Sequence, residues 1–249
     1  NYFEGQQDSD YIAVEGNVNS GIKSYAIENI AGINVPGDPQ GPRGNHNARL
    51  QYRDMEIFNN TDFTVDAYWQ KIENVFFYHE KFKDEGLGFI GGQSMITSDK
   101  TGLRLNFNSI FDFDNVEATL IYGVDILNDT TAQPLVDGRM WTPEMDMDNI
   151  AGYLQAKVIF DENWVLKAGV RQESIEIGVD DFSTLMICNP GKDCTVPVAV
   201  SGGTLKYDAT TYNVGIRYSN SELFSPFISY SEGFDIANVG SLLRNAKFN

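Results

Sequence analysis

Two cysteines that stand close together in the chain are the residues best placed to do chemistry. Cys188 and Cys194 lie in the stretch CNPGKDC, separated by five residues that include Asn189-Pro190-Gly191. Such a segment turns easily, so the two thiols can close a small ring. A disulfide would fit an oxidising exterior and would stiffen the loop that contains it. Two free thiols are the alternative, while a metal pair lacks a nearby His or further Cys.

An acidic run and two histidines are the other candidates for chemistry. Glu144, Asp146 and Asp148 stand in EMDMD, where spaced carboxylates can bind Ca²⁺, but no Gly-containing EF-hand pattern accompanies them. We therefore expect a solvated acidic loop at this place. His46 and His79 fall at strand ends or in loops, and neither stands in a known motif.

Catalytic motifs are absent from the sequence. It contains no G-x-S-x-G nucleophile elbow, no P-loop and no dinucleotide fingerprint. We expect no catalytic residue, no bound metal and no cofactor. A membrane-embedded lipase would need a Ser–His pair on adjacent strands, and abundant Ser and Thr leave that alternative open.

The charge balance narrows the class of partner. The chain of 249 residues has 35 Asp and Glu against 18 Lys and Arg, a net charge of −17. Nucleic-acid binding and polybasic membrane anchoring both need clustered Lys and Arg, so neither is expected. The sequence contains no run of 18 or more apolar residues, so no transmembrane helix is predicted. Transmembrane strands need only about 9–11 residues, and every second residue can face water.

Period-two alternation is the dominant pattern along the chain. In the stretch 164–171, the apolar side chains fall on one face, and Lys167, Gly169 and Arg171 fall on the other. Alternation of this kind predicts antiparallel strands with one apolar and one polar face. The predicted strands are 47–57, 63–77, 102–111, 116–127, 149–160, 164–178, 206–218 and 223–233, with a possible further strand within 1–15.

Short and long connections alternate between these strands. Short polar turns are predicted at 59–62, 112–115, 161–163 and 219–222, and aromatic residues flank every one of them. The long connections are 78–101, 128–148 and 179–205. An antiparallel meander then places all short turns at one end, as in outer-membrane β-barrels with interfacial aromatic belts. The polar faces would line the lumen, with Arg49, Gln51, Arg53, Asp66, Arg104, Asn106, Glu117, Asp125, Lys157, Lys167, Arg171 and Arg217.

Three stretches in the last third of the chain resemble TonB-dependent siderophore receptors. Phe224–Ala246 contains Tyr-Ser-Glu-Gly-Phe, followed by Gly-Ser-Leu-Leu-Arg. Leu166–Phe182 contains a Gly-Val-Arg core, and Gly202–Ser219 contains a Tyr-Asp that opens a strand toward Asn-Val-Gly. Together they look similar to the hydroxamate branch of the family, which includes the aerobactin receptor. The first 150 residues resemble the family only in their general pattern of barrel strands and connections.

The resemblance implies an all-β fold, an antiparallel transmembrane β-barrel of the bacterial outer membrane. About eight or nine strands of a barrel of about 22 would be present, so residues 1–249 would form a partial barrel domain without its plug. The implied partners are a ferric siderophore, the lipid and lipopolysaccharide of the outer membrane, and TonB through parts absent from this chain.

The resemblance also suggests where an anionic ferric chelate would bind. Arg, Lys and aromatic side chains on the extracellular side are suitable partners for carboxylate and hydroxamate groups. The candidates are Arg43, His46, Tyr78, His79, Lys81, Arg139 and Trp141. Receptors for haem, cobalamin or a glycan are alternatives within the same fold. A small self-contained porin or adhesin barrel is the alternative outside the family.

Overall fold

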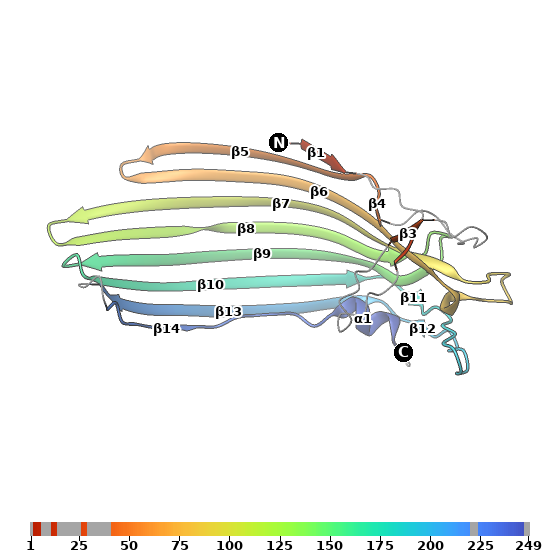
Figure 1. Cartoon of the computed structure of the whole chain (residues 1–249). Coiled ribbons are helices and arrows are strands. Elements are labelled where there is room, and N and C mark those ends of the chain that lie inside the picture. The colour runs from red at the N-terminus through yellow and green to blue at the C-terminus, as the bar shows by residue number, and fades with distance from the viewer. Residues whose placement is uncertain (1, 6–10, 14–25, 29–40, 220–223, 247–249) are drawn as a thin grey trace.

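The computed structural model describes residues 2–5, 11–13, 26–28, 41–219 and 224–246, which form a long antiparallel meander (Figure 1). No helix in these ranges is both long and apolar enough to cross a membrane. The main strands are β5 (Asn45–Phe58), β6 (Thr61–His79), β7 (Gly92–Phe113), β8 (Val116–Pro134), β9 (Met140–Phe160), β10 (Trp164–Val179), β13 (Gly203–Tyr218) and β14 (Phe227–Ser231). The shorter elements are β1 (Tyr2–Gly5), β2 (Tyr11–Ala13), β3 (Ala26–Glu28), β4 (Gly41–Pro42), the 3₁₀ turn η2 (Glu80–Phe82), β11 (Phe182–Ser183), β12 (Ala199–Val200) and α1 (Val239–Arg244).

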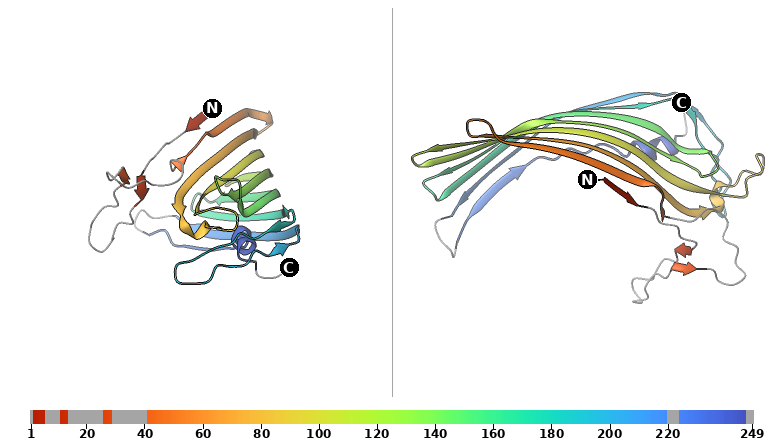
Figure 2. Two further views of the ribbon diagram at one scale, coloured as in Figure 1. Left: turned by 90° about the vertical axis from the view of Figure 1, so that its right-hand side faces the viewer. Right: turned by 90° about the horizontal axis from the view of Figure 1, so that it is seen from above.

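One sheet contains all the main strands, in the order β1-β5-β6-β7-β8-β9-β10-β13-β14. Every pairing between them is antiparallel. The sheet bends across its strands like a section of a barrel wall, as the two views in Figure 2 show. The prediction of an all-β antiparallel meander is confirmed, and β1 and β2 fall within the range 1–15 where a further strand was predicted.

The two faces of this sheet differ in chemistry, as the alternation predicted. Leu154, Leu166 and Val214 lie on one face and are 46%, 39% and 49% exposed. Exposure of this kind excludes a dry core made of these side chains, because such a core would remove them from solvent. We call this the outer face. It is a continuous apolar surface of the kind that a lipid-facing barrel wall presents.

The opposite face, here called the inner face, carries a ladder of ion pairs. Arg104 Nε lies 2.6 Å from Asp125 Oδ1, and Arg171 Nη1 lies 2.8 Å from Asp125 Oδ2. Farther along the sheet, Arg49 Nη2 lies 2.7 Å from Asp66 Oδ1. Strand register therefore gathers the predicted lumen-lining charges on one face and pairs most of them.

The prediction of three long loops is wrong for two of them. The connection predicted as 128–148 contains only residues 135–139, and the one predicted as 78–101 contains residues 80–91. Cross-strand polar contacts extend the strands: Thr130 Oγ1 donates to Asp146 Oδ1 at 2.7 Å, and Asn128 donates to Asp148. The run EMDMD is therefore part of β9 and not an acidic loop. The third connection remains long and contains only β11 and β12.

The short-turn end of the sheet carries rows of aromatic rings on the outer face. The ring centroids of Phe63 and Phe107 lie 4.7 Å apart, and those of Phe107 and Tyr122 lie 5.2 Å apart. Phe160 and Tyr218 flank Trp164 in the same way, at 6.0 and 4.6 Å from its centroid. Neighbouring strands thus join Phe160, Trp164 and Tyr218 beside the short turns into one cluster, and Phe63 with Phe107 and Tyr122 into another.

Gly123 gives a test of this strand packing. A Cβ at Gly123 would lie 2.1 Å from the Leu105 carbonyl oxygen and 2.7 Å from Tyr153 Oη, which donates to Asn106. We expect Gly123→Ala to lower the free energy of unfolding of the parent protein by about 1–3 kcal/mol, because neither the backbone nor the ring can move freely. Urea titration in detergent measures this. Gly152→Ala is the control, since nothing lies within 4 Å of that Cβ; equal stability loss in both variants would contradict the prediction.

Candidate functional site

Three of the predicted ligand-binding residues meet at the end of the sheet that is opposite the short turns. Lys81 comes from η2, Trp141 from the start of β9 and His79 from the end of β6. All three surround Phe82, which is completely buried. Antiparallel pairing brings these strand ends together, although they are distant in the sequence.

Trp141 is the centre of this cluster. Its ring packs edge-on against Phe82, with centroids 4.9 Å apart. Lys81 Nζ lies 4.4 Å from the centroid of Trp141 and 4.8 Å from that of Phe82. A cation over an indole face is held by the quadrupole of the ring, so Lys81 has a fixed place without a carboxylate partner.

Arg244, at the end of α1, supplies a second cation that sequence reasoning missed. Its guanidinium carbon lies 4.9 Å from the centroid of Trp141, and Nη1 donates to Gln133 Oε1 at 3.1 Å. The helix reaches this place because Val239 packs on Ile175 and Ile177 of β10, on the inner face. Arg244 stood within the Gly-Ser-Leu-Leu-Arg resemblance, which was the only signal for it.

Both cations contact Trp141, and neither has a counter-ion in the part of the chain that the structure describes. No ion pair joins Lys81 or Arg244 to a carboxylate there. Burial, with repulsion from Arg244 as a second cause, lowers the pKa of Lys81. An anion bound close to both would oppose these effects, because an opposite charge favours the protonated amine. We call Lys81, Trp141 and Arg244 the mouth site.

Arg139 holds the backbone beside this site. Its Nη1 donates to the Phe82 carbonyl oxygen at 2.6 Å, and Nη2 donates to that of Gly91 at 2.7 Å. The same guanidinium stacks on Phe89 at 3.9 Å and pairs with Asp137 at 2.7 Å. Burial disfavours the Asp137 carboxylate, but the hydrogen bonds from Arg139 outweigh it and lower the pKa of Asp137. Arg139 therefore fixes η2 and the 80–91 connection in place.

His79 belongs to the aromatic packing around the mouth site. Its ring lies 4.1 Å from the centroid of Phe77 and 6.2 Å from that of Phe82. Burial, and then the charge of Lys81, lower the pKa of His79, so the neutral imidazole is favoured. Among the described residues, no group of three or more His, Cys, Asp or Glu is arranged to hold a metal ion.

The remaining candidates lie apart from the mouth site. The Arg43 amide donates to the Glu73 carbonyl oxygen at 2.7 Å, and His46 stacks on Trp69 with centroids 6.3 Å apart. Tyr78 fills the space beside Gly91, where a Cβ would lie 2.3 Å from its hydroxyl oxygen. The structure thus places Arg43, His46 and Tyr78 in separate local contacts.

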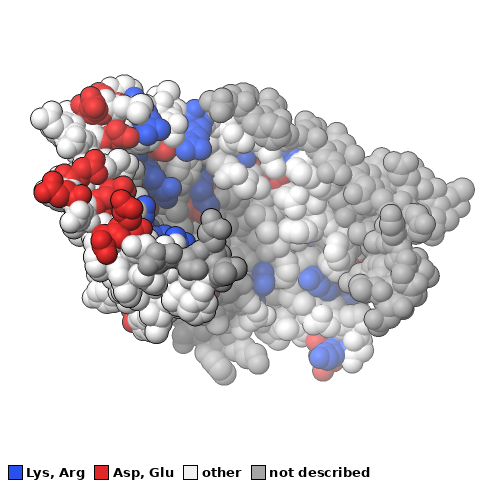
Figure 3. All heavy atoms as spheres, turned by 60° about the vertical axis from the view of Figure 1, so that its left-hand side comes forward, with Lys and Arg blue, Asp and Glu red and all other residues white. Residues whose placement is uncertain are grey.

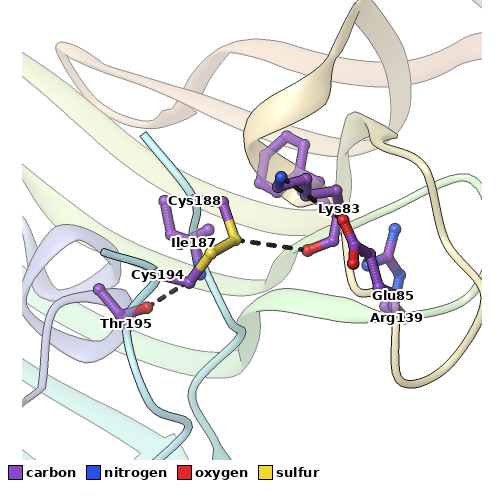
Figure 4. Close-up of a disulfide and its surroundings, with 8 residues drawn as sticks. Lys83, Glu85, Arg139, Ile187, Cys188, Cys194 and Thr195 are labelled. Carbon is purple, nitrogen blue, oxygen red and sulfur yellow. Dashed lines mark hydrogen bonds and ion pairs between the residues drawn. A yellow bond between two sulfur atoms is a disulfide. The ribbon is translucent and has the colours of Figure 1, made fainter. Parts of the chain in front are cut away.

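The predicted disulfide is present and is joined to the mouth site. Cys188 and Cys194 are bonded, and the Cys188 amide donates to the Lys81 carbonyl oxygen at 2.8 Å. Figure 4 shows the disulfide facing Lys83, whose carbonyl oxygen lies 3.8 Å from Cys188 Sγ. Just outside the ring, the flanking residues Ile187 and Thr195 exchange two hydrogen bonds of 2.9 Å. The closed loop therefore packs directly on the turn that presents Lys81.

We expect the double substitution Cys188→Ser and Cys194→Ser to loosen this turn. By the chain-entropy relation, a ring of this size contributes about 2 kcal/mol to ordering its loop. Part of that loss should appear in ligand affinity, as a decrease of about three- to tenfold for an anionic chelate. Fluorescence quenching of the detergent-solubilised parent protein measures it. Equal affinity in the oxidised wild type and the double variant would contradict this role for the loop.

Comparison with known proteins agrees with this architecture. Residues 2–248 match the family described as TonB dependent receptor-like, beta-barrel. The chain is 22% identical to the ferric aerobactin receptor of Klebsiella pneumoniae, over 96% of this chain and 35% of that protein. It is 22% identical to the rhizobactin receptor of Rhizobium meliloti, over 94% of this chain and 34% of that protein. The chain therefore spans about a third of the length of these curated relatives.

Solved structures show the same fold at lower identity. The siderophore receptor PiuA from Acinetobacter baumannii matches with a TM-score of 0.55 and 13% identity, over 92% of this chain and 38% of that one. The open form of the ferric-catecholate import receptor Fiu from E. coli K12 matches with a TM-score of 0.54 and 13% identity, over 75% of this chain and 35% of that one. The antiparallel meander and its two contrasting faces fit a β-barrel wall. The family match, which covers nearly the whole chain, points to the same fold. The chain belongs to the TonB dependent receptor-like β-barrel family, a family of receptors and not of enzymes.

Proposed function

We propose that this chain is part of the barrel wall of an outer-membrane receptor that imports a ferric siderophore. The proposal rests on one observation: Lys81 and Arg244 both lie against Trp141, and neither pairs with a carboxylate of the described residues. An anionic chelate complements such a site, because it supplies the missing negative charge and an apolar edge for the indole.

The names of the curated relatives support the class of cargo. Two of them are receptors for ferric aerobactin and for rhizobactin. We infer a chelate of the citrate–hydroxamate type, whose carboxylates would meet Lys81 and Arg244. In this proposal the apolar outer face contacts lipid and lipopolysaccharide, and residues 1–249 form one partial barrel domain. TonB would act through parts of the parent protein beyond this chain.

Growth under iron limitation tests the proposal. A strain that lacks the parent gene would be supplied with one ferric siderophore at a time, including citrate–hydroxamate, simple hydroxamate and catecholate chelates. We expect loss of growth on one citrate–hydroxamate chelate and restoration by the wild-type gene on a plasmid. Unchanged growth on every chelate would refute the cargo, and loss of growth on haem, cobalamin or a glycan instead would reassign it.

A further inference from the structure

Three cations lie together on the inner face near the short-turn end of the sheet. Lys157 of β9 is directly opposite Lys167 of β10, and Gly215 of β13 is opposite Lys167 on its other side. Arg217, two positions beyond Gly215, points to the same face. Like charges directly opposite each other in a sheet are destabilising, so this arrangement needs an explanation beyond strand pairing.

These cations differ from the other Lys and Arg side chains of the inner face, because none of them pairs with a carboxylate of the described residues. Arg49, Arg53, Lys100, Arg104 and Arg171, which lie on the same face, all form ion pairs. Within the described ranges, no ion pair joins Lys157, Lys167 or Arg217 to a carboxylate. Glu117 of β8 lies opposite Ile159 on this part of the face, and it too forms no ion pair with a described residue.

The three cations surround an open groove of about 330 Å³. Its apolar lining includes Ile159, Val165 and Phe227. Figure 3 shows Lys and Arg side chains gathered in the hollow of this face, behind Asp and Glu side chains at the short-turn end. A groove of this size with an apolar floor and convergent charges suits a small anion that also has hydrocarbon or amide surface.

The groove is separate from the mouth site. Trp141 lies at the start of β9 and Lys157 near its end, so roughly 50 Å of extended strand separates them, at about 3.3 Å per residue. Both sites lie on the same side of the same sheet, and the cations of both have no counter-ion among the described residues. This distance means that one small ligand cannot contact both sites at once.

We propose that Lys157, Lys167 and Arg217 form a second anion site, which holds a carboxylate-bearing chelate after it has left the mouth site. The proposal rests on the proposed function for the identity of the chelate, but the anion site itself does not depend on it. A second binding site along the route offsets part of the cost of leaving the first, because cationic partners are again available to the anion there. The alternative occupant is an acidic segment from the remainder of the parent protein.

Citrate is the probe for this site, measured by calorimetry on the detergent-solubilised parent receptor. The mouth variant Lys81→Gln/Arg244→Gln removes the first site and should retain citrate binding at the second. Adding Lys157→Gln, Lys167→Gln and Arg217→Gln should weaken the remaining binding by about tenfold or more, since three charged donors are lost. Arg53→Gln is the control on the same face, because Arg53 is already paired with Asp62 at 3.0 Å.

Uptake by whole cells gives the second readout. The triple variant with an intact mouth site should bind the iron-labelled chelate at the cell surface within twofold of wild type, while its uptake rate falls about tenfold. The charge-conserving variant Lys157→Arg/Lys167→Arg should retain both. Unchanged citrate affinity when the three substitutions are added to the mouth variant would overturn the proposal. A lower thermal stability of the triple variant with no effect of citrate would also overturn it, and would assign the cations to an acidic polypeptide segment. If the growth experiment identifies no siderophore as cargo, the citrate-binding measurement still tests whether the anion site exists.

Discussion

The double variant Lys81→Gln/Arg244→Gln should bind an anionic ferric chelate about 100-fold more weakly than wild type. Each side chain can donate one charge-assisted hydrogen bond, worth about 1.5 kcal/mol at the low end of the usual range. Two such bonds give about 3 kcal/mol, and every 1.4 kcal/mol corresponds to a tenfold change in affinity. Titration of the purified parent receptor with the chelate that supports growth measures this change.

Lys83→Gln is the matched control for that variant. Lys83 follows the same 3₁₀ turn, but its Nζ lies 3.7 Å from Glu85 and 45% of its side chain is exposed. We expect its removal to leave affinity within twofold of wild type. A similar loss in the control and the double variant would mean that general positive charge, and not the mouth site, attracts the ligand.

The pH dependence of binding gives a further check on Lys81. Burial and the nearby Arg244 lower the pKa of Lys81 below its usual value of 10.5. An anion favours the protonated amine, so binding is coupled to proton uptake, and affinity should fall as pH rises through that lowered pKa. His79, also in the cluster, has a lowered pKa and stays neutral through this alkaline range. Lys81→Gln should abolish the alkaline loss of affinity.

Leu154→Arg should destabilise the parent barrel in lipid by about 2–4 kcal/mol. Leu154 is 46% exposed and lies in the middle of the apolar outer face of β9, between Gly152 and Ala156. An arginine at that depth would face hydrocarbon, where its desolvation is not compensated. Urea-driven unfolding from phospholipid vesicles measures the difference in stability.

Gln155→Arg provides the matched control on the other face of the same strand. Gln155 lines the polar groove that also contains Arg104, Asp125 and Tyr153. Because this groove is hydrated in a barrel lumen, we expect a stability change of less than about 1 kcal/mol. Equal effects of Leu154→Arg and Gln155→Arg would refute the assignment of the outer face to lipid.

Several features of the fold could be predicted from the sequence because strand geometry makes them local. Alternation placed Leu166 and Arg171 on opposite faces, and the register confirms it. Three short turns, at 59–62, 112–115 and 161–163, were recognisable from Asn and Asp, which accept the backbone conformations of tight turns; Asn60 and Asp161 have φ values of 62° and 51°. The fourth, predicted at 219–222, lies almost entirely outside the described residues. The small ring of Cys188 and Cys194 was also a local matter.

The lengths of the strands beyond the apolar belt could not be predicted in this way. Polar residues such as Thr130 and Asp146 look like loop residues when each strand is considered alone. They stabilise a strand only when the register places them opposite each other, so that they form a hydrogen bond across the sheet. The predicted loops were therefore too long at the end where the mouth site lies.

The sequence by itself determined which side of each strand is apolar and where the chain turns tightly, since both depend on neighbouring residues. Only the tertiary structure decided which cations share Trp141. Lys81 meets Arg244 because α1 folds back onto Ile175 and Ile177, and Arg139 turns inward because carbonyl groups of a distant turn accept its hydrogen bonds. Contacts between residues so far apart in the chain follow from packing and register, which no local pattern encodes.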